Sequence, residues 1–257
     1  MRLKDNVTVI TGAAQGIGEA YARRFVAEGA KVALADINQD KVSGVADDLR
    51  RSGADVIAVG VDVSSEDSTK AMAAAVVEKY GRIDTLISNA AIYHDIDNQD
   101  HSFEYLRKIF DVNYFGTWLS ARACYPAMKK QGKGSIITQS SDAAYMRFGI
   151  PHEDLLPSYH YSVTKAAVNA LTHFLAATCG PHGVRVNAIS PGPTMTEATL
   201  KTVPQPMIDM IVQGLMAIKR PLEAEDLCGP AVFLASDESS MVTGQVLCVN
   251  GGLTMLG

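Results

Sequence analysis

The chain has 257 residues, of which 47% are hydrophobic and 20% are charged, and its formal net charge at pH 7 is −5. This length can enclose a full hydrophobic core, and α/β proteins of this size often form a single domain. A chain without a basic excess is not expected to bind nucleic acid, and no uninterrupted apolar run is long enough to cross a membrane.

Short β-branched runs alternate along the chain with longer segments of helical period. The expected strands are Val7–Thr11, Lys31–Asp36, Val56–Val61, Ile83–Ser88, Ser135–Gln139, Val184–Ile189 and Gln245–Val249. The expected helices are Ile17–Glu28, Gln39–Arg51, Ser65–Tyr80, Phe103–Lys130, Tyr161–Cys179 and Ala224–Ala235. Strands such as VTVI and TLIS are apolar on both faces, which is typical of a parallel sheet between helices. The pattern predicts a single α/β domain over residues 1–257, a doubly wound Rossmann fold with a seven-stranded parallel sheet flanked by helices on both faces.

The segment VTVITGAAQGIGEAYARRF combines a strand, a glycine-rich turn and a helix. Gly12 would permit a tight turn, Gly16 would let the backbone approach a pyrophosphate, and Gly18 would allow close helix–strand packing. The first amides of the helix would face the phosphates. No Lys followed by Ser or Thr comes after the glycines, which argues against a P-loop nucleoside triphosphatase. A turn that only connects two elements is the alternative.

Asp36 ends the next expected strand, near the distance of about 20 residues at which dinucleotide-binding folds place an acidic residue. Its carboxylate can accept hydrogen bonds from both hydroxyls of the adenosine ribose and would repel a 2′-phosphate. The surrounding residues that supply no compensating cation are Ala13, Ala14, Gln15, Ile37 and Asn38. The sequence therefore predicts NAD(H) as the cofactor in preference to NADP(H). Lys41 is the exception among these neighbours, and it is expected on the following helix.

The segment YHYSVTK contains two tyrosines and one lysine. Residues four apart share a helix face, so Tyr161 pairs with Lys165, whereas Tyr159 pairs only with Val163. A tyrosine normally loses its proton near pH 10, and a nearby ammonium lowers that pKa. Lys165 could thus make Tyr161 a usable acid and base. A surface pair on an amphipathic helix is the alternative, because this spacing alone is common by chance.

Taken together, these motifs resemble the short-chain dehydrogenase/reductase family over essentially the whole chain. TGAAQGIG matches the family's cofactor turn, and SNAA resembles its N-N-A-G. The remaining family motifs follow in order: Asn113 in DVNYFG, GSIITQSS, YSVTK, RVNAISPGPTMT and FLASDESSMVTGQVLCVNGG. Two positions depart from the family pattern. Ala91 replaces a glycine and could crowd the adenosine side, and Asn250 replaces the aspartate of D-G-G, which would weaken one carboxylate contact.

The resemblance implies a catalytic set for hydride transfer between an NAD cofactor and a carbinol carbon. Tyr161 would pass the proton, Lys165 would also hold the nicotinamide ribose, and Ser141 would hydrogen-bond the substrate oxygen. Ser140 is the alternative serine. Asn113 would kink its helix and hold a water that links Lys165 to a proton relay.

The resemblance also implies the cofactor contacts. Asp62 would contact adenine, Asn89 would line the cleft, and the segment from Pro191 to Thr196 would grip the nicotinamide carboxamide. The full set comprises Gly12, Gln15, Gly16, Ile17, Gly18, Asp36, Asp62, Val63, Asn89, Ala90, Tyr161, Lys165, Pro191, Gly192, Thr194 and Thr196.

Two insertions, near residues 142–158 and 192–218, interrupt the alternation, and such insertions are usually lids or binding loops. The apolar residues of the first are Tyr145, Met146, Phe148, Leu155 and Leu156; they could form a pocket wall or shape an oligomer contact. The Met-rich second segment could be a flexible apolar lid or ordinary core, and the resemblance favours the lid. Since neither carries an Arg/Lys cluster, an apolar or aromatic secondary alcohol or ketone is the expected small-molecule substrate.

The six histidines and four cysteines show no metal-ligand spacing, so no metal site is expected. His160, beside Tyr161, should face a neighbour or solvent. Four separated cysteines and an N-terminus without a signal-like stretch predict a cytoplasmic protein with reduced thiols. The resemblance implies a homotetramer. A non-redox lyase-like member of the fold and a non-catalytic NAD-binding scaffold or sensor are the alternative functions.

Overall fold

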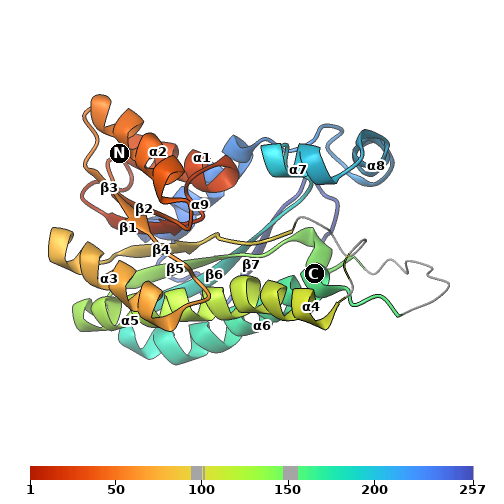
Figure 1. Ribbon diagram of the computed structural model, residues 1–257. Coiled ribbons are helices and arrows are strands. Elements are labelled where there is room, and N and C mark those ends of the chain that lie inside the picture. The colour runs from red at the N-terminus through yellow and green to blue at the C-terminus, as the bar shows by residue number, and fades with distance from the viewer. Residues whose placement is uncertain (94–99, 101, 147–155, 257) are drawn as a thin grey trace.

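The computed structural model describes residues 1–93, 100, 102–146 and 156–256, and its centre is one seven-stranded sheet (Figure 1). The strands lie in the order β3-β2-β1-β4-β5-β6-β7, and all neighbouring pairs are parallel. Their bounds are β1 Val7–Thr11, β2 Lys31–Asp36, β3 Val56–Gly60, β4 Thr85–Ser88, β5 Gly134–Gln139, β6 Val184–Pro191 and β7 Val246–Val249. The predicted doubly wound sheet is confirmed, and every predicted strand lies within two residues of its observed bounds.

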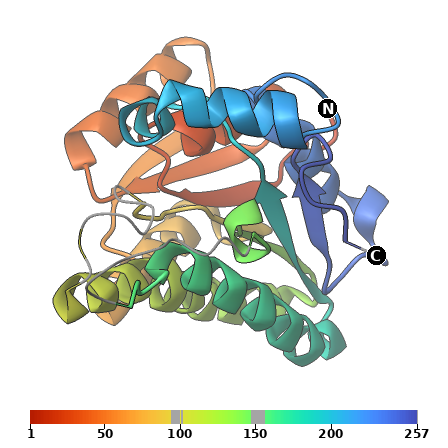
Figure 2. The same cartoon turned by 90° about the vertical axis from the view of Figure 1, so that its right-hand side faces the viewer.

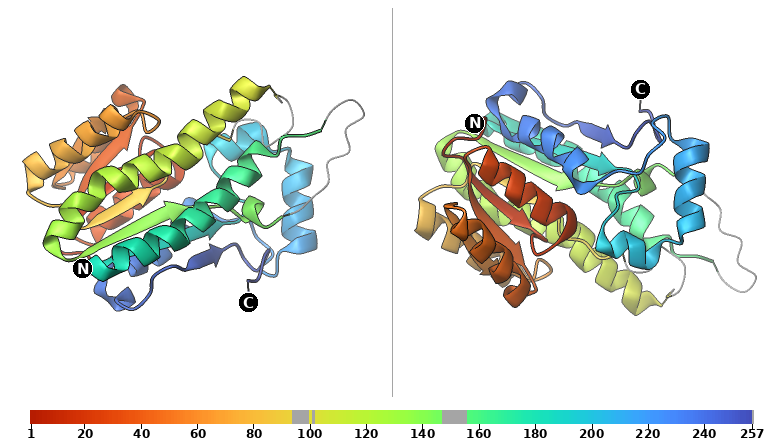
Figure 3. Two further views of the ribbon diagram at one scale, coloured as in Figure 1. Left: turned by 90° about the horizontal axis from the view of Figure 1, so that it is seen from below. Right: turned by 90° about the horizontal axis from the view of Figure 1, so that it is seen from above.

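Helices cover both faces of the sheet, as Figure 3 shows from either side. One layer contains α1 (Gly16–Ala27), α2 (Gln39–Arg51) and α9 (Cys228–Ala235). The other contains α3 (Glu66–Tyr80), α4 (Phe103–Phe110), α5 (Gly116–Gln131) and α6 (His160–Cys179). Adjacent strand residues point to opposite cores, so Ile10 packs with the first layer and Val9 with the second. This arrangement explains why the central strands are apolar on both faces.

The predicted helix Phe103–Lys130 is interrupted in the structure. A π-helical turn, η1 (Asp111–Phe115), separates α4 from α5. The side chain of Asn113 pairs with the backbone of Ile92, donating from Nδ2 to the carbonyl at 2.9 Å and accepting from the amide at 2.8 Å. Such turns often occur at functional sites. The expected kink at Asn113 thus takes the form of a local change of helix type that ties this layer to the chain after β4.

The lid region crosses the carboxyl ends of the strands. It contains α7 (Glu197–Thr202), α8 (Gln205–Met210) and the π-helical turn η4 (Ile211–Leu215). Figure 2 looks onto this end of the sheet, with these helices in blue on one side and α6 in green on the other. The short 3-10 turn η2 (Asp142–Ala144) lies between them, beside the strand ends.

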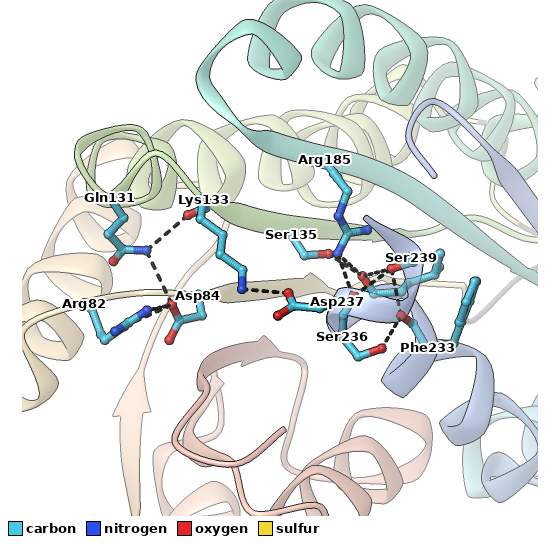
Figure 4. A network of polar contacts seen from close by, with 11 residues as sticks. Arg82, Asp84, Gln131, Lys133, Ser135, Arg185, Phe233, Ser236, Asp237 and Ser239 are labelled. Atoms are coloured by element: carbon cyan, nitrogen blue, oxygen red, sulfur yellow. Dashed lines mark hydrogen bonds and ion pairs between the residues drawn. The ribbon is translucent and has the colours of Figure 1, made fainter. Parts of the chain in front are cut away.

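The amino ends of the strands carry a polar network (Figure 4). Asp84 accepts from the Val7 amide at 2.9 Å and from Arg82 Nε at 3.0 Å. Lys133 Nζ lies 2.6 Å from a carboxylate oxygen of Asp237. The guanidinium of Arg185 donates to the Leu234 carbonyl in the last turn of α9 and to the carbonyls of Ser236 and Val242 between α9 and β7. This network joins strand ends to the loops between helices.

Candidate active site

A cavity of about 1020 Å³ opens at the carboxyl ends of the strands, between the lid and α6. Its size is at the upper end of the range of about 300–1,000 Å³ for small-molecule sites. The carboxyl edge is where open α/β sheets bind ligands. Ser141 and every residue of the predicted cofactor set except Gly18 line the cavity. Gly18 and Asn113 lie behind the lining.

The glycine turn after β1 adopts the conformation that its sequence predicts. Gly12 has φ +68°, and a Cβ at this position would lie 2.9 Å from Ala90 Cα. Gly16 has φ +56°, a region that favours glycine. A Cβ on Gly18 would overlap the Gly12 carbonyl oxygen, so only glycine lets α1 pack this closely under the turn. These bare backbones form the cradle that a pyrophosphate needs.

The end of β4 supports this turn. Asn89 Nδ2 donates to the carbonyls of Thr11 and Gly12, both at 3.1 Å. The hydroxyl of Thr11 accepts in return from the Asn89 and Ala90 amides at 3.1 and 3.2 Å. Thr11 is the first residue of the motif TGAAQGIG, but it was not among the site residues predicted from the sequence. Ala91 lines the cavity and is exposed.

Asp36 ends β2 with its carboxylate held by two backbone amides. Ala14 donates to Oδ2 at 3.0 Å and Asn38 donates to Oδ1 at 2.9 Å. Lys41 lies on α2 as predicted, but its ammonium reaches back to the side-chain oxygen of Gln15 and lines the cavity. It also lies 3.9 Å from a carboxylate oxygen of Glu197, the first residue of α7. The Lys41 ammonium therefore lies closer to the glycine turn than its expected position on the following helix indicated.

Asp62 and Val63 follow β3 on the same side of the cavity. Oδ1 of Asp62 accepts from the amide and the hydroxyl of Ser64, at 2.9 and 2.6 Å. Val63 packs against Gly116, where a Cβ would lie 2.7 Å from a Val63 methyl group. Gly116, another residue that the sequence analysis missed, thus lets the start of α5 approach this loop. With the bare glycine turn and the oriented carboxylate of Asp36, these residues fit a dinucleotide.

Tyr161 and Lys165 lie on the first turns of α6, on the face that lines the cavity. Lys165 Nζ lies 5.6 Å from the Tyr161 ring centroid and donates to the Gln139 carbonyl at 2.8 Å. Lys165 is 2% exposed, and this burial lowers its pKa to about 8. The ammonium therefore remains mostly charged at neutral pH while it lies beside the tyrosine ring. The spacing argument that selected Tyr161 agrees with this geometry.

The two serines after β5 have different environments. Ser140 is 2% exposed, and its hydroxyl is directed toward the Lys165 carbonyl at 3.4 Å. Ser141 is half-buried, and its Oγ accepts from the Ala143 amide at 3.2 Å. Because that bond uses a lone pair, the Ser141 hydroxyl proton remains available for a ligand oxygen. This environment favours Ser141 over the alternative Ser140.

The residues before Tyr161 also separate by environment. Tyr159 precedes α6 with φ +47° and lines the cavity. His160 is buried, with Nδ1 2.7 Å from the Ser158 hydroxyl and its ring 5.0 Å from the Tyr105 ring. His160 therefore faces neighbours, as predicted.

Three hydroxyl groups connect the catalytic side of the cavity to the lid. The hydroxyl of Tyr93 lies 3.2 Å from that of Thr196 and 3.0 Å from that of Thr199. The Tyr93 ring also packs against the Tyr161 ring, with centroids 5.8 Å apart. Tyr93 was not selected from the sequence. It links the predicted proton donor to the first residues of the lid.

The predicted lid is part cavity wall and part core. Met207, Ile208 and Ile211 line the cavity, whereas Met216 is buried in the core. In the first insertion, Met146 lines the cavity and Leu156 is 91% exposed. The segment 147–155, including Phe148 and Leu155, lies outside the described residues, so the choice between pocket wall and oligomer contact stays open.

Asp142, which follows Ser141, was also not among the site residues predicted from the sequence. Asp142 is buried, and its Oδ1 accepts from Asn250 Nδ2 at 3.0 Å. Burial raises the pKa of Asp142 to about 6, although hydrogen bonds lower it in part. Asn250, which replaces the aspartate of D-G-G, therefore still takes part in a contact with a carboxylate. Asp142 supplies that carboxylate. The contact spans 108 residues of sequence, so no local pattern could have indicated it.

Within the described ranges, no group of three or more His, Cys, Asp or Glu side chains could hold a metal ion. Cys124, Cys179 and Cys228 are buried free thiols, and Cys248 is a half-buried one. In the part of the chain that the structure describes, no helix is long and apolar enough to cross a membrane.

Comparison with known proteins gives matches over nearly the whole chain. A family model described as enoyl-(acyl carrier protein) reductase matches residues 12–254. An uncharacterized oxidoreductase of Mycobacterium tuberculosis is 42% identical over 249 residues, which cover 96% of each protein. L-rhamnose 1-dehydrogenase (NAD(P)(+)) of Azotobacter vinelandii is 34% identical, covering 98% of each protein.

A solved structure agrees with these sequence matches. The structure described as 7α-hydroxysteroid dehydrogenase complexed with NADH and 7-oxo glycochenodeoxycholic acid matches with a TM-score of 0.90 at 31% identity. The match covers 98% of this chain and 95% of that one.

Proposed function

The chain belongs to the short-chain dehydrogenase/reductase family of oxidoreductases, and from this premise we propose that it is an NAD-dependent dehydrogenase of secondary alcohols, or reductase of the corresponding ketones. One observation carries the proposal. The buried ammonium of Lys165 lies 5.6 Å from the Tyr161 ring, in the cavity that the glycine turn also lines.

Tyr161 acts as the general acid and base. Its phenol would ordinarily titrate near pH 10, and the adjacent positive charge stabilises the phenolate. In the oxidative direction the phenolate takes the proton of the substrate hydroxyl, and in the reductive direction the phenol returns it. NAD, when bound, would supply the acceptor for the hydride that leaves the carbinol carbon.

Ser141 and Lys165 position the reacting groups. The Ser141 hydroxyl, already fixed by the Ala143 amide, donates to the substrate oxygen and orients it toward Tyr161. Lys165 holds the cofactor ribose as well as the charge beside Tyr161. Asn113, paired with Ile92 and 3.4 Å from the Thr164 hydroxyl, acts from behind α6 and holds the relay water that the family resemblance implies.

NAD is the proposed cofactor because Asp36 presents its carboxylate at the end of β2. The two amides that hold it fix its orientation at the cavity, and its negative charge would accept from ribose hydroxyls and repel a 2′-phosphate. The NADH-bound steroid dehydrogenase supports this choice, whereas the name of the rhamnose dehydrogenase allows either cofactor. Among the described residues near Asp36 that line the cavity, Lys41 is the cation that could favour NADP.

The proposed substrate is apolar or aromatic. Tyr93, Met146, Met207 and Ile211 contribute apolar surface to the cavity beside the catalytic residues. The steroid dehydrogenase among the structural relatives is complexed with 7-oxo glycochenodeoxycholic acid, whose steroid rings agree with an apolar lining.

A homotetramer in the cytoplasm is the proposed state of the enzyme. Phe115, Trp118 and Phe174 expose apolar surface on the layer of η1, α5 and α6, and Leu247 does so on the edge strand β7. Exposed apolar patches of this kind often mark association surfaces. The free thiols fit a reducing compartment.

The test is a panel of aliphatic, aromatic and sterol secondary alcohols, incubated with the purified protein and NAD while NADH absorbance is followed. Steady NADH formation with at least one alcohol is expected. Binding of NAD without turnover on any alcohol or ketone would instead favour the non-catalytic scaffold, and conversion without NADH formation would favour a lyase.

A further inference from the structure

Asp142 is a buried carboxylate directly after Ser141. It is 3% exposed and begins the 3-10 turn η2, for which Ser141 is the N-terminal cap. Its Oδ1 accepts from Asn250 Nδ2 at 3.0 Å, from the Thr254 hydroxyl at 3.1 Å and from the Ser190 hydroxyl at 3.4 Å. Its Oδ2 is buried and has no hydrogen-bond partner among the described residues. One carboxylate oxygen thus joins the η2 turn to two other segments, β6 and residues 250–254.

Both of these segments adjoin the predicted nicotinamide end of the cavity. Ser190 lies on β6, two residues before Gly192. A Cβ on Gly192 would lie 3.0 Å from Asn250 Cα, so Asn250 packs directly against this backbone. The Gly192 amide also donates to the Val249 carbonyl at 3.1 Å. The partner of Asp142 is therefore fixed to the segment that is expected to hold the cofactor.

Residues 250–254 also reach the end of the lid. The Gly251 carbonyl accepts from the amides of Ala217 and Ile218, at 2.9 and 2.8 Å, immediately after η4. Gly251 has φ +61°, and a Cβ there would collide with the end of the Met216 side chain. Residues 250–254 therefore connect the carboxylate of Asp142 to the point where the lid rejoins the core.

We propose that Asp142 is a positioning residue for Ser141, because its carboxylate fixes the Ser141 turn to residues 250–254 and, through them, to the end of the lid. The catalytic part of this inference rests on the proposed function. The structural part, a hydrogen-bonded brace (Asp142, Ser190, Asn250 and Thr254), does not.

The ionised form of Asp142 makes the brace. Burial raises its pKa to about 6, and among the described residues the titratable groups that interact with it are Tyr145 and Cys248, whose own pKa values burial raises. Since its folded pKa lies above the unfolded value of 3.8, the stability it contributes is greatest below that value and is lost as pH rises through about 6. Ionising Asp142 in the folded protein therefore costs some stability. A carboxylate kept at such a cost is consistent with a positioning role.

The experiment compares Asp142→Asn, Asn250→Asp and the double variant, with the exposed Glu78→Gln on α3 as a matched control. Asp142→Asn keeps an acceptor oxygen, so the protein should fold. Asn250→Asp places two carboxylates in contact and should destabilise the fold, whereas the double variant, with one carboxylate on the opposite side, should recover most of the loss.

Amide hydrogen exchange of Ala143 and Ala144, whose amides Ser141 holds, reports the position of the turn without any substrate. Asp142→Asn should accelerate this exchange about tenfold, and the double variant should reverse it. Unchanged exchange in Asp142→Asn, or additive unfolding free energies in the cycle, would overturn the brace whatever the alcohol panel shows.

Turnover then tests the catalytic part. Asp142→Asn should lower kcat about tenfold with NAD affinity unchanged, and it should abolish a decline of wild-type kcat below about pH 6. The double variant should recover kcat. If Asp142→Asn accelerates exchange but leaves kcat and the pH profile like wild type, Asp142 serves the fold alone and the positioning role is wrong. Failure of wild type on every alcohol would instead contradict the proposed function, while the exchange result still decides the brace.

Discussion

The polar groups at the amino and carboxyl ends of the sheet differ in their surroundings. At the amino end, Asp84 accepts from an amide and a guanidinium, and Lys133 pairs with Asp237. At the carboxyl end, Gln139 Nε2 and Asp142 Oδ2 are buried with no hydrogen-bond partner among the described residues. Leaving such atoms without partners costs stability. The Thr85 hydroxyl, at the amino end of β4, is also buried without a partner among the described residues, but it does not line the cavity, whereas Gln139 and Asp142 do. The ends therefore differ in the cavity, which lies at the carboxyl end.

The sharpest way to break this comparison is to remove the central charge of the carboxyl end. Lys165→Met should lower kcat by about 10²-fold, because the phenolate of Tyr161 loses its stabilising charge. Stability should not fall at pH 7. The folded pKa of about 8 lies below the unfolded 10.5, so wild-type stability should rise with pH across that interval and the variant should lack this rise. Denaturant unfolding at pH 7 and pH 10, beside turnover, checks both.

The matched change at the amino end should have the opposite signature. Arg185→Met removes three bonds to the carbonyls of Leu234, Ser236 and Val242. The free energy of unfolding should fall by about 2 kcal/mol, since buried carbonyls lose a charged donor. Turnover per folded molecule and NAD affinity should stay within twofold of wild type. A large loss of kcat at full stability would show that the two ends are not separable.

Cofactor choice sharpens the comparison at the adenosine side. Asp36→Ala should reduce the preference for NAD over NADP about tenfold, because the repulsion of a 2′-phosphate is lost. Lys41→Ala is the paired variant and should weaken NADP more than NAD. Titration of both cofactors against each protein gives the ratios. A wild type that prefers NADP would contradict the interpretation of Asp36.

The smallest effect is expected at the lid. Tyr93→Phe keeps the ring beside Tyr161 but removes the hydroxyl that meets Thr196 and Thr199. KM for the alcohol should rise about threefold with little change in kcat, as expected for one neutral hydrogen bond. Steady-state kinetics with Thr199→Val as the companion variant would show whether the two changes share one contact.

Local sequence predicted the parts that depend on local physics. The bounds of β1 and β2, the tight turn at Gly12, the close packing at Gly18 and the Tyr161–Lys165 face all follow from periodicity or steric rules. Contacts between residues that are distant in the sequence could not be predicted by such local rules. Lys41 meets Gln15 from another element, Asp142 meets Asn250 across 108 residues, and the π turn at Asn113 depends on the backbone of Ile92.

The central claim is that the carboxyl end is a dehydrogenase site whose proton passes through Tyr161. Wild type and Tyr161→Phe should be compared with NAD and the best alcohol of the panel, with NAD binding measured on the same samples. The account predicts a loss of kcat of about 10³-fold with NAD affinity within a few-fold of wild type. Turnover by Tyr161→Phe at the wild-type rate would contradict it.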